Sequence, residues 1–298
     1  MSTVSQNVPR EVARSPGRIT VQRALRHGSF WVGGTIILAI VFAALFAPLL
    51  TSYDPGAQDL ASRYVPPFWA ANGSTEHLLG TDGLGRDVLA RLLYGARISL
   101  LIGFLTVVIS GFIGTVMGVA AGYFGGTVDL VVNFVITIRL TMPVVLVALV
   151  VVALVGSSLW LMIMVIGLLL WDRFAIVVRA STQQLAQREY ITSARTIGSS
   201  TWRILVKEIL PNITGPLVVV GSIELAHAIL LEAALSFLGL GVQPPSVSWG
   251  LMVAEAKNQL LFRPWMIAVP GVALVLLIFA INLVGDAIRD VTTPEGKA

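Results

Sequence analysis

Three ionisable side chains lie in a run of the sequence that is otherwise apolar. Glu224, His227 and Glu232 fall within residues 215–240. A spacing of three residues puts Glu224 and His227 on one helix face, and a spacing of eight, near two turns, brings Glu232 close to it. Charged groups are costly inside a membrane, so they either line a polar path through it or form a buried network that fixes helix packing. Histidine and glutamate also bind metals, but one histidine without cysteine is a poor ligand set, and we predict no metal site.

The composition favours a membrane protein. The chain has 298 residues, of which 56% are hydrophobic and 12% are charged. A soluble domain carries about 25% charged residues, which argues against a very apolar soluble enzyme. The chain contains no cysteine, which excludes disulfides and thiolate chemistry.

Six apolar runs are long enough to cross a bilayer, which takes roughly 20 residues. The third is expected to be extended backwards by a helix that starts near Val128, and the fourth is interrupted by Asp172 and Arg173. Pro143 is expected to kink the third span near its inner end. The predicted spans are Trp31–Leu50, Ile98–Gly122, Leu140–Val155, Leu159–Val178, Gly215–Leu240 and Trp265–Val284.

The distribution of arginine and lysine predicts the orientation. Residues 1–30 are rich in arginine, and the loop 179–212 carries further basic residues, whereas the basic residues of 51–97 are offset by acids. The positive-inside rule then places both termini in the cytoplasm. A cleaved signal peptide is the alternative for the first residues, but its apolar region would be shorter than this one. We expect an N-terminal arm (1–30), a first span with an external cap (31–97), a transmembrane core (98–290) that includes a cytoplasmic loop (183–212), and a cytoplasmic tail (291–298).

The segment 189–212, EYITSARTIGSSTWRILVKEILPN, predicts two short helices outside the membrane. Gly198 is expected to end the first helix and the following serines to cap the second, which Pro211 stops or kinks. Trp202, Leu205 and Ile209 are expected to share one face. One alternative is a solvated loop without a partner. The other is a stiff element that docks into a groove on a partner protein.

Three further patterns concern packing and turns. Gly111, Gly114, Gly118 and Gly122 form a stripe that predicts close helix packing. Gly83-Leu84-Gly85 is interpreted as a tight turn into a helix capped by Asp82, and not as a phosphate loop, because the P-loop lysine is missing. Arg139 is expected to reach the headgroups from the inner boundary.

The segment 189–212 resembles the cytoplasmic loop of ABC-importer permeases, which has the pattern E-A-A-x-x-x-G followed by L-P. Thr192 and Ser193 replace the first two residues of that pattern. Further matching stretches are typical of the dipeptide/oligopeptide/nickel branch, its C-type subunit in particular. They are HLLGTDGLGRDVLARLLYGARISL (77–100), AGYFGG (121–126), EAALSFLGLGVQPPSVSWGLM (232–252) and NLVGDAIRDVTTP (282–294).

This resemblance implies an all-α integral membrane protein with the type I ABC-importer permease fold, in the bacterial inner membrane. It implies a second, B-type permease, two ATP-binding subunits and an external substrate-binding protein as partners, with membrane lipid around them and no nucleic acid. The chain has no G-x-x-x-x-G-K-[ST] motif, so ATP and Mg²⁺ are expected on the ATPases, with no cofactor here and no enzymatic activity. A membrane enzyme is disfavoured because H-E-x-x-H and G-x-S-x-G are absent, and a non-transporting scaffold is the remaining alternative.

The resemblance also assigns roles to residues of this chain. The expected solute is a di- or oligopeptide, with a nickel chelate, glutathione or an opine-like compound as alternatives. Glu224, His227 and Glu232, which stand out by their charge within an apolar span and not by the resemblance, are the candidates for the translocation path. The expected external cap and binding-protein dock comprises Gly80, Thr81, Asp82, Gly85, Arg86 and Asp87. The expected ATPase-coupling loop comprises Glu189, Tyr190, Thr192, Ser193, Ala194, Arg195, Gly198, Trp202, Leu210 and Pro211.

Overall fold

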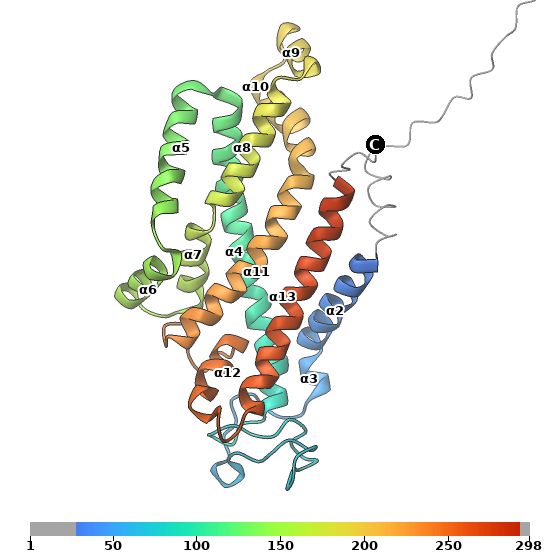
Figure 1. Ribbon diagram of the computed structural model, residues 1–298, viewed down its shortest axis with the longest axis vertical. Coiled ribbons are helices and arrows are strands. Elements are labelled where there is room, and N and C mark those ends of the chain that lie inside the picture. Colours follow the sequence, from blue (N-terminus) through green and yellow to red (C-terminus); the bar gives the residue numbers. More distant parts are fainter. Residues whose placement is uncertain (1–27, 293–298) are drawn as a thin grey trace, which may run out of the picture.

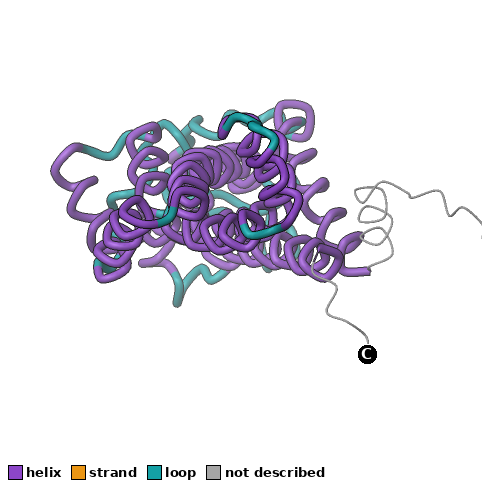
Figure 2. Tube along the Cα trace, turned by 90° about the horizontal axis from the view of Figure 1, so that it is seen from above, coloured by secondary structure: helices purple, strands orange, loops and turns teal. Residues whose placement is uncertain are grey.

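The computed structural model describes residues 28–292, so most of the predicted N-terminal arm and C-terminal tail lies outside the described residues. Within this range the chain is helical and has no strand, apart from one isolated bridge between Thr81 and Asp87 (Figures 1 and 2). The long helices are α2 (Gly28–Leu45), α4 (Val88–Phe124), α5 (Gly126–Thr141), α6 (Val144–Val155), α7 (Leu159–Leu169), α8 (Asp172–Ala186), α11 (Thr214–Phe237) and α13 (Trp265–Thr292). The short ones are α3 (Ala47–Leu50), α9 (Glu189–Thr196), α10 (Thr201–Ile204) and α12 (Trp249–Ala256).

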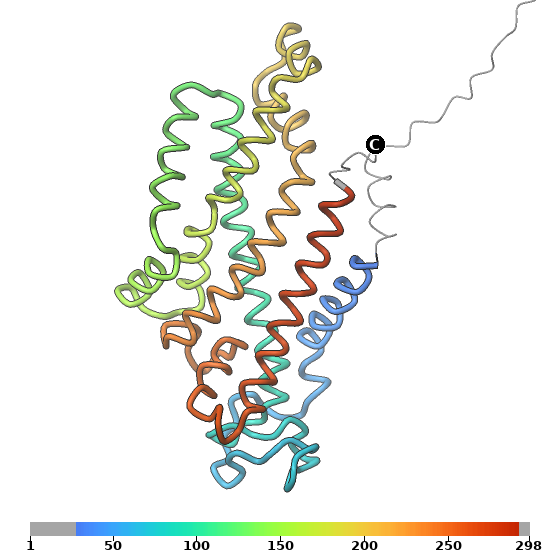
Figure 3. Tube along the Cα trace, in the orientation of Figure 1, coloured from blue at the N-terminus to red at the C-terminus, as the bar shows by residue number. Residues whose placement is uncertain are grey.

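The helices provide up to six membrane crossings. Within residues 28–292, five segments are long and apolar enough to span a bilayer, and α5 with α6 forms a sixth if this pair, bent by 83°, counts as one span. Followed along its colours, the chain runs back and forth between two ends (Figure 3). Helices α9 and α10 lie at one end, and a cap formed by residues 51–87 lies with α12 at the other (Figure 1). The start of α2 and the end of α13 point towards the end that carries α9 and α10.

Several spans are longer than predicted, α4 and α8 among them. Helix α4 begins at Val88, ten residues before the expected Ile98, because the Asp87 carboxylate accepts a hydrogen bond from the Ala90 amide at 2.6 Å and caps it. Helix α8 continues to Ala186, so Arg179 lies in a helix and not in the predicted loop. A hydropathy profile places the end of a span at a charged residue. Here the Arg179 guanidinium forms an ion pair with Asp129 of α5, and the helix continues past it.

The third span is broken at Pro143. Met142, the residue before the proline, is extended with φ −90° and ψ 122°, and α6 starts at Val144. A proline excludes its predecessor from helical geometry, and this separates α5 from α6. Because α5 contributes 16 residues before the break, Pro143 lies within the span and not near its inner end as predicted.

The glycine stripe of α4 packs closely against another helix, as predicted, and the structure shows that this helix is α8. A Cβ added to Gly114 would lie 2.4 Å from the carbonyl oxygen of Trp171, and one on Gly118 would lie 2.7 Å from that of Ala175. Gly122 meets Arg179 in the same way at 2.7 Å. The two backbones approach so closely because these positions lack side chains.

Replacing Gly114 by alanine should therefore weaken the α4–α8 contact. Overpacking a close contact costs about 1–3 kcal/mol, and the thermal midpoint of the purified protein in detergent should fall accordingly. Gly111→Ala is the matched control, since its Cβ would make ordinary contact with Phe174 at 3.4 Å. Equal midpoints for the two variants would contradict this packing.

Candidate functional site

A cavity of about 520 Å³ lies where the breaks between α5 and α6 and between α7 and α8 face α11. Both helix breaks leave room that side chains of continuous helices would fill. Its charged and polar lining comes from the middle of the spans, and the rest is apolar. The lining residues are Arg139, Leu140, Met142, Pro143, Val144, Val145, Leu170, Asp172, Arg173, Glu224, His227, Leu230, Leu231 and Ala234.

The predicted pair Glu224 and His227 does meet, and Arg173 joins it. Nη1 of Arg173 lies 3.2 Å from Oε1 of Glu224, and Nδ1 of His227 lies 3.3 Å from the same oxygen. Nη1 of Arg173 is also 3.0 Å from Nδ1 of His227. The Glu224 side chain is 1% exposed, whereas that of Arg173 is 52% exposed and that of His227 is 42% exposed. The group therefore presents a guanidinium and an imidazole, with the carboxylate behind them.

Glu232, the third predicted member, lies outside this cavity. Its Oε1 accepts hydrogen bonds from the hydroxyls of Ser236 and Ser248, both at 2.7 Å, and the Glu232 side chain is buried. Ser248 caps α12 through the Leu251 amide. Eight residues at 3.6 per turn leave a rotation of about 80°, which is enough to turn Glu232 towards α12. Glu232 thus connects α11 to α12. Of the two roles considered for this residue, this is a buried network that fixes helix packing and not a contact in the path.

Arg139 does not reach the membrane boundary, so that prediction is wrong. Its Nε donates to the carbonyl oxygen of Leu169 at 2.7 Å, Nη2 donates to the same oxygen, and Asp172 lies 3.8 Å away. The last carbonyls of a helix have no partner within it, and the break after α7 leaves such groups inside the protein. The buried guanidinium of Arg139 satisfies one of them.

The loop after α8 has the predicted helix, bend and helix. Gly198 has φ +79°, and hydrogen bonds run from its amide to Arg195 and from the Ser199 amide to Ala194, each 3.0 Å long. This is the glycine termination that the sequence indicates. The Ser200 hydroxyl then accepts from the Arg203 amide at 3.4 Å and caps α10.

Pro211 does not end the second helix, contrary to one form of the prediction. After α10 the chain continues through a π-helical turn (Leu205–Ile209) and a 3₁₀ turn (Leu210–Ile213) directly into α11. Proline fits the first residues of a helical turn, where its missing N–H is not needed. The residues from Thr201 to Phe237 therefore form one helical segment with an irregular stretch.

The faces of this segment also differ from the prediction. Trp202 is 75% exposed and does not share the buried face of Ile209. That face is formed by isoleucines from both helices, which pack with Val119 of α4 and Val178 of α8. The buried isoleucines are Ile191, Ile204, Ile209 and Ile213.

The outer surface of the loop combines polar and apolar side chains. Ile197 is 82% exposed and Tyr190 is 43% exposed. The Arg195 guanidinium lies 4.5 Å from the ring centre of Tyr123, which links α9 to the end of α4. Of the predicted coupling residues, Ala194 and Leu210 are half-buried; Glu189, Thr192, Ser193, Arg195, Gly198 and Pro211 are exposed.

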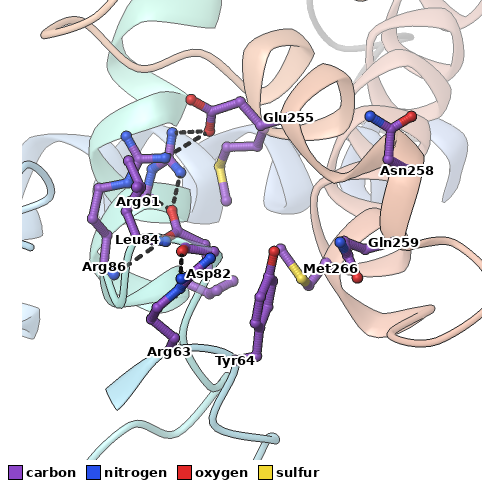
Figure 4. Close-up of a pocket in the computed structure, with 13 residues that line it drawn as sticks. Arg63, Tyr64, Asp82, Leu84, Arg86, Arg91, Glu255, Asn258, Gln259 and Met266 are labelled. Atoms are coloured by element: carbon purple, nitrogen blue, oxygen red, sulfur yellow. Dashed lines mark hydrogen bonds and ion pairs between the residues drawn. The ribbon is translucent and has the colours of Figure 1, made fainter. Parts of the chain in front are cut away.

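At the opposite end, the cap is joined to α12 by an ion-pair network (Figure 4). Oδ2 of Asp82 accepts from Nε of Arg86 at 2.7 Å and from Nη1 of Arg91. Both guanidiniums also reach Oε2 of Glu255, at 3.0 Å from Arg86 and 2.6 Å from Arg91. Burial raises the pKa of Asp82, but the two arginines and the backbone amides of Leu84 and Arg86 outweigh it and hold this pKa below its ordinary value.

The other cap residues shape the turn before α4. A Cβ on Gly85, with φ +74°, would lie 1.7 Å from the Asp59 carbonyl oxygen, and one on Gly80, with φ +78°, would lie 2.3 Å from that of Val65. The Thr81 hydroxyl accepts from the Val65 amide at 2.8 Å. The helix cap is Asp87 and not Asp82 as predicted, because Asp82 uses both oxygens inside the turn and the network.

Three residues that complete these sites were missing from the predicted sets. They are Arg173 in the cavity and Arg91 and Glu255 in the cap network. A charge inside an apolar run was the available signal for Arg173, which lies near the middle of Leu159–Ala186. Nothing in the spacing pairs Glu255 with residues more than 160 positions earlier.

Comparison with known proteins assigns the family. Residues 114–295 match the model of the binding-protein-dependent transport system inner membrane component. The chain belongs to this family. In addition, residues 15–67 of the permease match the N-terminal transmembrane domain of oligopeptide transport permease C.

Full-length relatives of the permease have been named in several bacteria. It is 39% identical to the di/tripeptide transport system permease protein DppC of Pseudomonas aeruginosa, over 92% of this chain and 91% of the relative. It is 38% identical to a putative peptide transport system permease protein of Brucella abortus, over 99% of this chain and 97% of the relative. Identity to the dipeptide transport system permease protein DppC of Haemophilus influenzae is 35%, over 89% and 90%.

Solved structures agree on the fold of the permease. Chains from two crystal forms of the inward-facing MetNI methionine ABC transporter superpose with TM-scores of 0.53 and 0.55 at 19% identity. They cover 68% of this chain and 96% and 97% of theirs. The predicted type I ABC-importer permease fold is thereby confirmed.

Proposed function

We propose that this permease is the C-type subunit of an ATP-driven importer and forms half of a path for di- and oligopeptides across the bacterial inner membrane. The names of its relatives, which cover nearly the whole chain, support the peptide as the solute. The second half of the path would come from a B-type permease. An external binding protein would deliver the solute at the end that carries the cap.

The orientation follows from charge. The end formed by α9 and α10 carries basic side chains with few acids, whereas arginines of the cap are paired with carboxylates. The positive-inside rule then puts α9, α10 and both termini in the cytoplasm.

The observation that carries the coupling role is the exposed apolar surface of the loop. Ile197 and Trp202 project at an end that would face water, while the isoleucines behind them fix the loop to α4 and α8. Exposed apolar side chains on a firmly held helix pair suit a groove on a partner protein. We infer that two ATP-binding subunits dock on this permease and its B-type partner, and that they, not this chain, hold ATP and Mg²⁺ and perform hydrolysis.

Co-purification tests this assembly. The tagged chain, co-expressed with the products of its neighbouring genes, should bring down a second permease and the ATPases. Trp202→Ala should release the ATPases and leave the second permease bound. The matched control is Leu261→Ala, an 89% exposed apolar residue in the segment between α12 and α13 at the other end. Recovery of the chain alone under mild detergent would favour a scaffold instead.

The solute is tested separately on the purified assembly. Mixed di- to pentapeptides with the binding protein should stimulate ATP hydrolysis. Stimulation by a nickel chelate, glutathione or an opine, with none by peptides, would retain the importer and reject the peptide.

A further inference from the structure

Arg173 is an exposed charge in a place that lipid cannot cover. It lies near the middle of the segment Leu159–Ala186, and its side chain is 52% exposed. An arginine at the centre of a bilayer costs at least about 2.5–3.5 kcal/mol when it faces hydrocarbon. The face that carries Arg173 must therefore meet water or a polar partner.

The cavity around Arg173 presents hydrogen-bond donors and hides its acids. The side chains of Asp172 and Glu224 are 6% and 1% exposed. The second guanidinium, that of Arg139, is engaged with Leu169 and is 10% exposed. Although the formal charges of Arg139, Asp172, Arg173 and Glu224 cancel, the most exposed polar groups of the cavity lining are Arg173 and His227.

The Arg173 guanidinium keeps free donors. Among the described residues its contacts with Glu224 and His227 use Nη1, which leaves Nε and Nη2 for a ligand. Arginine binds carboxylates through two parallel N–H groups, an arrangement that needs such a free edge. Behind it, Oε1 of Glu224 and Nδ1 of His227 fix the position of Nη1.

We propose that Arg173 is the water-facing contact for the carboxylate of the solute in transit, with Glu224 and His227 as its positioning residues. The proposal deepens the proposed function and rests on it: a peptide with a free C-terminal carboxylate supplies the ligand. No metal is required, and among the described residues no three histidine, cysteine or acidic side chains are grouped to hold one.

Thiol labelling of the assembled transporter tests the site without relying on transport. The chain has no cysteine, so Leu230→Cys introduces the only thiol of this subunit, beside the cavity and one turn from His227. Labelling by an anionic and a cationic methanethiosulfonate reagent of similar size is compared. The anionic reagent should be favoured, and Arg173→Gln should reduce that preference at least about fivefold.

Further variants separate a local charge from a structural effect. Arg173→Lys should keep the preference, and so should Arg179→Gln, which removes an arginine of the same helix that pairs with Asp129. If Arg173→Gln does not assemble, the double variant Arg173→Gln/Glu224→Gln removes the buried carboxylate as well and should show the same loss.

Peptides then test the ligand. Alanyl-alanine should slow the labelling, alanyl-alanine amide should slow it at least about tenfold less, and Arg173→Gln should abolish this difference.

No labelling by either reagent, or a preference that survives Arg173→Gln, would overturn the site. Anionic preference without peptide protection would overturn the carboxylate assignment. An assembly that labels as expected yet imports no peptide would reject the proposed function instead.

Discussion

Replacing Asp82 by asparagine should weaken the attachment of the cap to α4 and α12 and lower the free energy of unfolding by about 3–5 kcal/mol. The substitution keeps the size of the side chain and removes its charge. Arg91, which is 3% exposed, and Arg86, which is 8% exposed, would then share Glu255 as their remaining counter-charge. A shift of the thermal midpoint in detergent, with earlier proteolysis inside residues 51–87, is the expected readout.

Asp54→Asn is the control for this change. Asp54 also accepts a hydrogen bond from the backbone amide two residues on, that of Gly56 at 2.7 Å, but it is exposed and has no arginine partner in the described part of the chain. Its replacement should leave the midpoint nearly unchanged. If Asp82→Asn were equally mild, the network would contribute little to the attachment of the cap.

The same network should make the cap sensitive to acid. The pKa of Asp82 is lower in the folded state than its ordinary value of 3.8. Its contribution to stability is therefore complete above the ordinary pKa and is lost as the pH falls through the folded pKa. The wild-type midpoint should drop more steeply below about pH 4 than that of Asp82→Asn.

Gly198→Val should leave the permease in the membrane but reduce solute uptake per ATP hydrolysed by roughly tenfold. A left-handed conformation costs a side-chain-bearing residue about 1–2 kcal/mol, and more for a β-branched one, so the bend between α9 and α10 would be lost or displaced. A Cβ at this position would meet nothing within 4 Å. The effect is therefore conformational and not steric.

Gly198→Asn separates these causes, because asparagine tolerates the left-handed region. The asparagine variant should retain most of the coupling although it, like the valine variant, adds a side chain at this position. Uptake and ATP hydrolysis measured together in proteoliposomes give the ratio. Equal losses for valine and asparagine would show that the size of the side chain matters here and not its backbone angle.

Local features of this chain were predictable because neighbouring residues determine them. The bend at Gly198, the cap by Ser200 and the close approach at Gly114 each depend on a few adjacent positions and on simple sterics. The number of spans followed from apolar length. The exact ends did not, because Arg179 and Arg91 stay in helices by pairing with residues on other elements.

The cavity could be predicted in part. Glu224 and His227 share a helix, so their proximity follows from spacing, whereas Arg173 reaches them from another span. Arg139 shows the same limit: its partner is a carbonyl oxygen freed by a helix break that the sequence does not reveal. Pairing between distant segments requires the packing of the spans, and a single sequence does not contain it.

The continuous helical segment from Thr201 to Phe237 has a mechanical consequence. Trp202 lies near its start and Glu224 lies further along it, about 33 Å away at 1.5 Å per residue. A tilt of about 10° around the α10 end would carry Glu224 by roughly 6 Å, more than the length of its contact with Arg173. A movement at the α10 end would thus make or break the ion pair between Arg173 and Glu224 through the helix itself, without passing through a loop.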